Sequence, residues 1–376
     1  SLMFAILPPV ARNLGLSEVQ VGVIFAVSGV LWVLSSPFWG RLSDVWGRRP
    51  VILVGLLGFA SSMAMFGLVV QASLAGWLAL LPTYLLMIAT RAVFGILGSA
   101  TAPAANAYVA DRTEPEERVA QLATQSAGFG LGFTIGPGVV SVLLIFGLVT
   151  PFYAIAVLGF LGALIIGLKL PEQPPRQRRA SSGERMSPFD PRVLPYLLVG
   201  IALGIGQATA MQTAGFYAID VLGMSIEQSA RLVGIALMGA AAAGLFVQLV
   251  VIRLLKPLPR TMMGVGSVFA MAGFALLVFG SSYPIMLIAM VVLGFSFGLV
   301  RPGATAGASL AVSREEQGAV AGLMNTTGAL GAVFAPVVGM SLYQIMPRAP
   351  YVLDFLLMIV AIALVAWHPG IRHPRR

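Results

Sequence analysis

Two arginines stand inside long apolar stretches of the chain, where a charged side chain has little water to bind. Arg91 lies within residues 77 to 110, and Arg301 lies within residues 284 to 311. A charge at such a position is costly and is retained by default for a function. A guanidinium can hold a carboxylate with two parallel hydrogen bonds. A purely structural arginine, satisfied by carbonyls and polar side chains or snorkelling to the surface, is the alternative for each.

Carboxylates are placed differently from these arginines. All 14 acidic residues fall in loops or near the ends of apolar stretches, and none is central in one. A cationic ligand inside a membrane is usually paired with a carboxylate, so two arginines without one favour an anionic, zwitterionic or neutral ligand. We therefore expect Arg301 to bind an acidic group of the ligand.

A charged segment, Gly40 to Pro50, separates two uncharged stretches. Asp44 and Arg48 are four residues apart, which is the spacing of a helical ion pair. Gly40 and Gly47 allow close approach and chain reversal. Asp111, at the end of a later stretch, could join Arg48 and Arg49 in one cluster. The alternative is that these arginines only anchor the chain at the membrane surface.

Uncharged polar side chains inside the stretches outline a candidate cavity. Each of them costs free energy in lipid unless it is satisfied, and a water-filled cavity would satisfy it. For any one of them, a role in helix packing is the alternative. The set consists of Asn106, Gln125, Gln207, Gln212, Asn325 and, for stacking and hydrogen bonding, Tyr217.

Twelve apolar stretches position all these residues. Charged residues make up 10% of the chain and hydrophobic ones 58%, with a mean hydropathy of +0.92, whereas a soluble domain carries about 25% charge. A membrane span needs about 20 residues and must be helical in lipid. The first stretch, 2 to 10, is shorter, so we expect the first helix to be truncated at its start. The others lie at 20 to 39, 51 to 70, 77 to 110, 119 to 146, 150 to 170, 193 to 218, 229 to 252, 261 to 280, 284 to 311, 317 to 345 and 350 to 367.

The basic residues between the stretches fall mainly on one side of the membrane. Only Arg12, Arg231 and Arg348 fall on the other side. The positive-inside rule assigns the crowded side to the cytoplasm, and contact with anionic lipid explains the net charge of +9 better than nucleic acid does. We predict a multi-pass protein of the inner (cytoplasmic) membrane with both termini in the cytoplasm.

The two halves of the chain repeat each other. With a constant offset of 199 residues, Gly95 matches Gly294 and Pro137 matches Pro336. Earlier in each half, Gly15-Leu16-Ser17 matches Gly223-Met224-Ser225. The polar segment 171–192 lies between the halves. We predict six-helix bundles at 1–170 and 193–376, an arrangement in which a ligand site lies where the repeats meet.

The repeat also aligns Arg12 with Asp220, at the outer ends of the first and seventh helices. We predict a salt bridge between them that helps close an outer gate. Solvated charges without a partner are the alternative.

Three motifs in this order resemble a known family. Gly40-x-Leu42-x-Asp44-x-x-Gly47-Arg48-Arg49 resembles the signature between the second and third helices of the major facilitator superfamily. Arg91-Ala92-Val93-Phe94-Gly95 resembles the arginine motif of its fourth helix. Gly132-x-x-x-Gly136-Pro137 resembles a motif in the fifth helix of its antiporters. The resemblance covers nearly the whole chain and extends to the drug:proton antiporter branch.

The resemblance implies an all-α membrane protein with the major facilitator fold and twelve transmembrane helices. It implies that the cluster of Asp44, Arg48 and Asp111 latches a cytoplasmic gate, and that Arg91 takes part in proton transfer. The expected function is proton-coupled export of a small organic molecule, with the proton gradient in place of a cofactor. A proton-coupled importer of an anionic metabolite or siderophore is the alternative.

An enzyme is not expected, because no serine is set with a histidine and an acid and no glycine-rich nucleotide loop is present. We expect the partners to be the small-molecule substrate, protons and membrane lipids. No nucleic acid or metal is expected, and we expect the protein to be a monomer.

Overall fold

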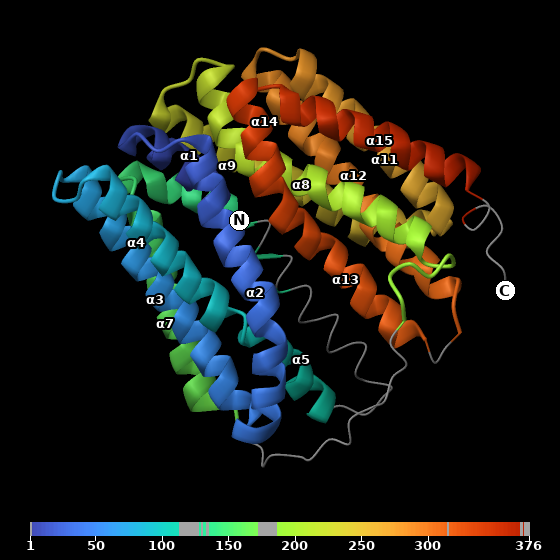
Figure 1. The fold of residues 1–376 in the computed structure, drawn as a ribbon, viewed down its shortest axis with the longest axis horizontal. Coiled ribbons are helices and arrows are strands. Elements are labelled where there is room, and N and C mark those ends of the chain that lie inside the picture. The colour runs from blue at the N-terminus through green and yellow to red at the C-terminus, as the bar shows by residue number, and fades with distance from the viewer. Residues whose placement is uncertain are drawn as a thin grey trace. The chain divides into compact units, whose positions relative to one another are not determined.

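The computed structural model describes residues 2–112, 128, 131–132, 135–171, 186–313, 316–368 and 371. Helices and short turns make up this part of the chain, and it contains no strand (Figure 1). Nine of the described helices are long and apolar enough to cross a membrane. The expected all-α membrane fold is therefore confirmed. Part of the predicted stretch 119 to 146 lies outside the described residues, which include the helix Ile135–Phe146.

The chain divides into two compact units by its internal contacts. The N-terminal unit comprises Val10–Gly132 and Val142–Ser181, and the C-terminal unit comprises Ser1–Pro9, Phe133–Ser141 and Ser182–Arg376. Two short early segments thus group with the later half of the chain. The simpler boundaries at 170 and 193 stay a prediction.

The N-terminal unit is built around α3 (Arg48–Leu74), which packs along α7 (Thr150–Lys169) and α4 (Leu80–Val93) (Figure 1). Around these lie α2 (Glu18–Trp46), the π turn η1 (Phe94–Gly98) and α5 (Thr101–Arg112). The first helix, α1 (Leu2–Leu14), contributes its last turn to this unit, and η2 (Leu144–Phe146) precedes α7.

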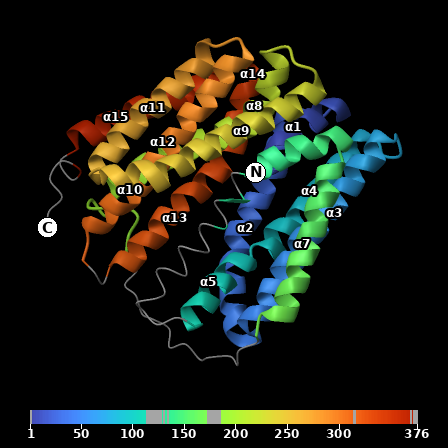
Figure 2. The ribbon, with the colours of Figure 1, turned by 180° about the vertical axis from the view of Figure 1, so that it is seen from behind.

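In the C-terminal unit, α12 (Tyr283–Leu310) packs against α11 (Pro259–Phe279), α9 (Ile226–Phe246) and α8 (Leu194–Asp220) (Figure 2). The helix α15 (Ala349–Trp367) packs on α11 and α8, and α13 (Gln317–Phe334) packs on α8. The remaining elements are short: η3 (Val247–Val251), α10 (Ile252–Leu255), η4 (Ala335–Gly339) and α14 (Met340–Ile345).

The structure repeats the sequence match between Gly15-Leu16-Ser17 and Gly223-Met224-Ser225. Both glycines have positive φ, +77° at Gly15 and +67° at Gly223. Both serines cap the next helix through their hydroxyl groups. The Ser17 hydroxyl accepts from the backbone N–H of Gln20 at 3.3 Å, and the Ser225 hydroxyl accepts from the backbone N–H of Gln228 at 3.2 Å. In turn, the side-chain oxygen of each glutamine accepts a hydrogen bond from the backbone N–H of its serine, which completes a capping box. The two units therefore start their second helices in the same way.

Gly95 and Gly294, which the repeat pairs, both lie at close helix contacts. A Cβ on Gly95 would lie 2.8 Å from the Ser28 carbonyl oxygen of α2. A Cβ on Gly294 would lie 1.9 Å from the Ala240 carbonyl oxygen of α9. Backbone meets backbone at both places, which only a residue without a side chain allows. The repeat therefore preserves a contact between equivalent helices.

Of the matched prolines, Pro336 lies at a departure from regular helix and Pro137 lies within the helix Ile135–Phe146. Pro336 lies in the π turn η4, and the carbonyl of Pro137 accepts a hydrogen bond from the Ser141 hydroxyl at 2.9 Å. Proline removes a backbone donor, which favours such departures. Gly132 and Gly136 lie in the preceding turns, and a Cβ on Gly132 would meet open space. The part of these glycines and of Pro137 in gating stays a prediction.

Candidate functional site

One guanidinium gathers the charged residues at the junction of α2 and α3. Arg48 Nη2 lies 2.6 Å from Asp44 Oδ1, and Arg48 Nε lies 3.0 Å from Asp111 Oδ2 at the end of α5. Arg48 Nη1 also donates to the Ser43 hydroxyl at 2.6 Å, a contact that the sequence reasoning missed. The Arg48 side chain is 7% exposed. We call Ser43, Asp44, Arg48 and Asp111 the junction cluster; its role as a gate latch stays a prediction.

The junction itself is a single residue. Gly47 ends α2 and precedes α3 with φ +95°, a conformation that a side chain would strain. Gly40 lies in the last turns of α2, where a Cβ would be 3.7 Å from Pro103. Arg49 donates to the Gly167 carbonyl of α7. The charged segment Gly40 to Pro50 thus consists of two helix ends joined at Gly47. Its side chains connect α2, α3, α5 and α7.

Arg91 is buried in the N-terminal unit, with 6% of its surface exposed. Its Nη2 donates to the Ser28 hydroxyl at 3.3 Å, and its guanidinium carbon lies 4.2 Å from the centroid of the Phe94 ring. No carboxylate pairs with it among the described residues. Ser28 and the ring therefore replace the acid that a buried arginine normally requires.

The charges predicted to form an outer gate each have a partner within their own unit. Arg12 forms an ion pair with Glu18 at the start of α2. Asp220 accepts a hydrogen bond from the Tyr343 hydroxyl of α14 at 3.1 Å. The pair of Arg12 with Asp220 stays a prediction.

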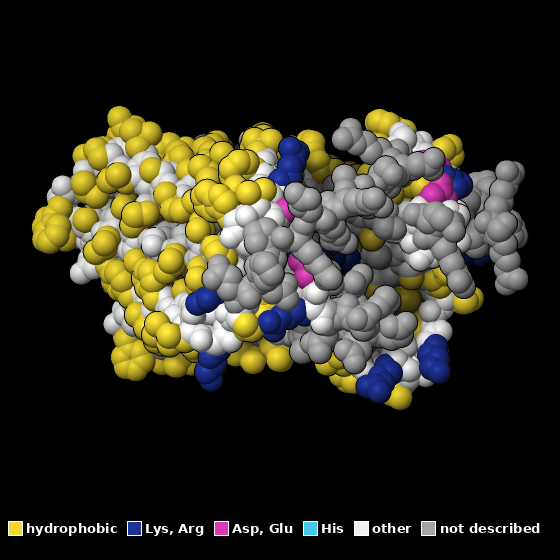
Figure 3. Space-filling model, turned by 90° about the horizontal axis from the view of Figure 1, so that it is seen from below, with side chains coloured by type: hydrophobic (Ala, Val, Ile, Leu, Met, Phe, Trp, Pro, Cys, Tyr) yellow, Lys and Arg dark blue, Asp and Glu magenta, His cyan; other side chains and the backbone are white. Residues whose placement is uncertain are grey.

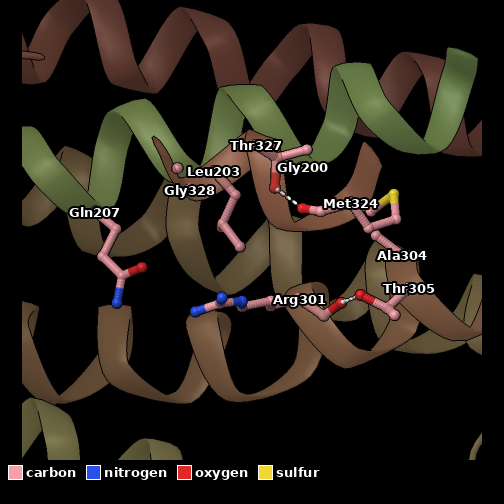
Figure 4. Close-up of a pocket in the computed structure, with 10 residues that line it drawn as sticks. Gly200, Leu203, Gln207, Arg301, Ala304, Thr305, Met324, Thr327 and Gly328 are labelled. Atoms are coloured by element: carbon pink, nitrogen blue, oxygen red, sulfur yellow. Dashed lines mark hydrogen bonds between the residues drawn. The ribbon is translucent and has the colours of Figure 1, made fainter. Parts of the chain in front are cut away.

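Arg301 extends into a hollow of the C-terminal unit between α8, α12 and α13 (Figure 4). The Arg301 guanidinium and the Gln207 amide reach into this hollow from facing helices. Arg301 is exposed rather than buried, and its side chain has no ion pair or hydrogen bond within the described chain. Its charge is therefore available to a ligand.

Other walls of this hollow offer few competing polar groups. The hydroxyl of Thr305 donates to the Arg301 carbonyl at 3.0 Å, and that of Thr327 donates to the Met324 carbonyl at 2.7 Å (Figure 4). Leu203 and Met324 add apolar surface. A cation, an amide and apolar walls are the kinds of group that recognise an organic molecule with an acidic group.

The other predicted cavity residues are placed differently. Gln212 is buried, and its Oε1 has no hydrogen-bond partner among the described residues. Asn106 is exposed on α5. Gln125 lies outside the described residues, as does the side chain of Asn325.

Tyr217 does not line the Arg301 hollow, contrary to the expectation from sequence. Its side chain is 1% exposed, and its hydroxyl lies 2.9 Å from the carbonyls of both Leu277 and Gly280. The hydroxyl is used in helix packing because α8 turns this face toward α11.

Asp354 is a buried carboxyl group that the sequence analysis did not single out, although it lies near a span end as expected. It lies in the second turn of α15, is 1% exposed, and neither carboxyl oxygen has a hydrogen-bond partner in the described structure. Sequence position alone placed it close to a span end, whereas packing against α8 and α11 buries it. An acid inside a stretch that is otherwise apolar was the available signal.

The surface of the molecule agrees with a membrane-spanning protein. Hydrophobic side chains cover much of the surface in Figure 3, and on the face shown basic side chains are more widespread than acidic ones. Together with nine apolar spans, a repeated helical architecture and a hollow with an available cation, these features define a membrane transporter rather than an enzyme.

The comparisons with known proteins identify the family. The profile of the Major Facilitator Superfamily matches residues 1–336 and 229–376, and the chain belongs to this family. It is therefore a secondary transporter of a small molecule.

Relatives in sequence and structure support this assignment. The chain is 26% identical to Multidrug resistance protein 1 of Bacillus subtilis (strain 168) over 374 residues, 97% of this chain and 92% of the relative. It is 30% identical to the class C Tetracycline resistance protein of Escherichia coli over 181 residues, 47% of this chain and 42% of the relative. A mutant of the nucleoside transporter NupG has the same fold, with a TM-score of 0.75 at 15% identity, covering 97% of this chain and 95% of that one.

Proposed function

We propose that this transporter exports small organic molecules with an acidic group, anionic or zwitterionic, in exchange for protons across the inner membrane. Two sequence relatives are named for resistance to multiple drugs and to tetracycline, which supports export. The Arg301 hollow supports the choice of substrate.

The observation that carries the proposal is the available guanidinium of Arg301 beside Gln207. A substrate carboxylate would accept two parallel hydrogen bonds from it, and the Gln207 amide could donate another. Because Arg301 is exposed and its side chain has no ion pair within the described chain, its guanidinium can bind a substrate carboxylate without first breaking an internal pair.

The direction of transport is tested with inverted membrane vesicles that have an acidic lumen. A pair of dyes isolates the acidic group: a zwitterionic rhodamine with a free carboxylate, and its methyl ester, which is a cation. We expect the vesicles to accumulate the zwitterion because protons leaving the lumen drive the dye inward. Expulsion of the zwitterion under the same gradient would assign the protein to import instead, and equal accumulation of the ester would refute the role of the acidic group.

Arg301→Gln is the matched test of the site. We expect it to raise KM for the zwitterion by roughly tenfold to a hundredfold, the effect of losing a hydrogen bond to a charged group worth about 1.5–3 kcal/mol. Transport of the ester should change little. Arg253→Gln is the control, since Arg253 is exposed on α10 outside the hollow. An unchanged KM for the zwitterion in Arg301→Gln would overturn the proposed binding site.

A further inference from the structure

The interior of the C-terminal unit holds a carboxyl group that the Arg301 hollow does not use. Asp354 lies where α15 meets α8 and α11. A Cβ on Gly206 of α8 would lie 3.7 Å from Asp354 Cγ and 2.7 Å from the Phe274 ring of α11. The missing side chain at Gly206 therefore makes room for the carboxyl against an aromatic ring.

No positive charge balances this carboxyl. Both of its oxygens lack a hydrogen bond within the described residues, although the Thr209 side chain of α8 lies nearby. An ionised carboxylate in such surroundings loses the solvation of water without a compensating partner, a penalty of several kcal/mol. The group takes the neutral form instead, which requires a bound proton.

The charged and titratable groups around Asp354 offer it no cation. Tyr351 is on the same helix and Tyr217 is on α8. Tyr343 on α14 donates to Asp220. On α11, the basic residue is Arg260, which donates to the carbonyls of Val365 and Ala366 at the other end of α15.

A row of side chains with hydroxyl groups lies along α8 between Asp354 and the end of that helix. Thr209, Thr213 and Tyr217 are spaced by four residues and so share one face of that helix. The Thr213 hydroxyl lies 2.8 Å from that of Tyr351, and the rings of Tyr351 and Tyr217 meet edge to face with centroids 5.3 Å apart. The Thr213 hydroxyl donates to the Thr209 carbonyl at 2.7 Å, so it accepts from the Tyr351 hydroxyl.

The row of hydroxyl side chains ends near the carbonyl of Gly280, the residue that follows α11. The Tyr217 hydroxyl and Arg348 Nη2 both bond the Gly280 carbonyl, at 2.9 Å and 3.1 Å. The loop charges assign this end to the outer side of the membrane, where protons are abundant in a cell with an energised membrane.

We propose that Asp354 is a proton-binding site of this transporter, loaded from the end of α8 through the hydroxyls of Tyr217, Tyr351 and Thr213. Loading forms one O–H bond on the carboxylate with a proton taken from water. Release breaks that bond, leaves the electron pair on the carboxylate and returns the proton to water. The coupling role of this site rests on the proposed proton-driven function, whereas proton binding itself does not.

Infrared spectroscopy of the full chain in lipid nanodiscs tests proton binding without transport. We expect a carbonyl band of a protonated carboxylic acid at neutral pH, absent in Asp354→Asn and shifted in Asp354→Glu. Glu227→Gln is the control, because Glu227 is an exposed carboxylate on α9 and should leave the band unchanged. A spectrum that Asp354→Asn does not alter would overturn the proposal. Stabilisation of the wild type by sodium ions, lost in Asp354→Asn, would also overturn it, in favour of a bound cation.

Transport by the same variants tests coupling. Asp354→Asn retains the shape of the neutral acid, so we expect it to fold and to exchange dye across the membrane without a gradient. Accumulation driven by the proton gradient should be lost. Full gradient-driven accumulation in Asp354→Asn would refute the coupling role. The wild type could also show no dye accumulation driven by the proton gradient while its infrared band depends on Asp354. That result would refute the proposed proton-driven function and still support Asp354 as a proton-binding site.

Discussion

At the scale of single residues, the junction cluster shows how one guanidinium serves several partners. Arg48 is the shared donor, so its removal leaves Asp111, whose side chain is 16% exposed, without its cation. We expect Arg48→Gln to lower the free energy of unfolding by roughly 1–3 kcal/mol, the cost of an unsatisfied polar group. Thermal unfolding in detergent measures this. Arg41→Gln is the control, since Arg41 is exposed in the same turns of α2, and an equal loss there would contradict the prediction.

A second residue-scale prediction concerns pH. Arg192 donates to Glu316 at 2.7 Å and 3.0 Å, and these bonds, with one from the Ser313 amide, lower the pKa of Glu316 from its ordinary value of 4.5 to about 2. Because the folded-state pKa is the lower one, the pair stabilises the fold above pH 4.5. The contribution is lost as pH falls through about 2.

The unfolding temperature of Glu316→Gln relative to wild type measures this effect. The variant should be less stable at neutral pH, and the difference should shrink as pH falls below 4.5. The effect is small because Arg192 is exposed to solvent. A difference that does not change with pH would refute the assignment.

Residue types predicted part of the site. Asp44 and Arg48 form the ion pair expected from their spacing, although they lie in different helices on either side of Gly47. Charge alone singled out Arg91 and Arg301. Packing decided the rest: the Tyr217 hydroxyl is held by carbonyls at the end of α11, and Asp354 is enclosed by α8 and α11. Nothing local to these two residues specifies which neighbouring helix they face.

At the scale of elements, the matching capping boxes make the two units comparable. Ser17→Ala and Ser225→Ala each remove one serine cap, and we expect a loss of about 1 kcal/mol for each. Removal of the Ser17 cap should lower the stability more than removal of the Ser225 cap, because Ser17 is less exposed than Ser225. Thermal unfolding of the two variants measures this loss. A Ser17→Ala protein as stable as the wild type would contradict the prediction.

The close contact of α12 with α9 gives a second element-scale prediction. Gly294→Ala places a methyl group against the Ala240 backbone, which cannot rotate away, so we expect a loss of about 1–3 kcal/mol. Gly322→Ala is the matched control in α13, because a Cβ there meets nothing within 4 Å. Alanine should be neutral or stabilising at that position. Equal stability of the two variants would refute the close contact.

At the scale of the whole molecule, loop charge predicts the orientation in the membrane. The chain has no cysteine, so single cysteines can be labelled without a background. In intact cells we expect an impermeant thiol reagent to label a cysteine at Trp77, which is 80% exposed between α3 and α4. A cysteine at Ser187 should react with the same reagent only after the membrane is permeabilised. The reverse pattern would invert the topology.

The sequence by itself determined the spans, the repeat and the family, because span length, helix caps and glycine positions are local properties that survive without knowledge of packing. The sequence analysis expected Asp111 to join Arg48, and the tertiary structure supplies the contact itself across 63 residues of sequence. Tertiary packing also turned Arg301 toward Gln207 in a hollow, and it buried Asp354 without a partner. Which face of each helix meets which neighbour is a long-range property. For that reason the candidate binding site and the proposed proton site emerged from the fold.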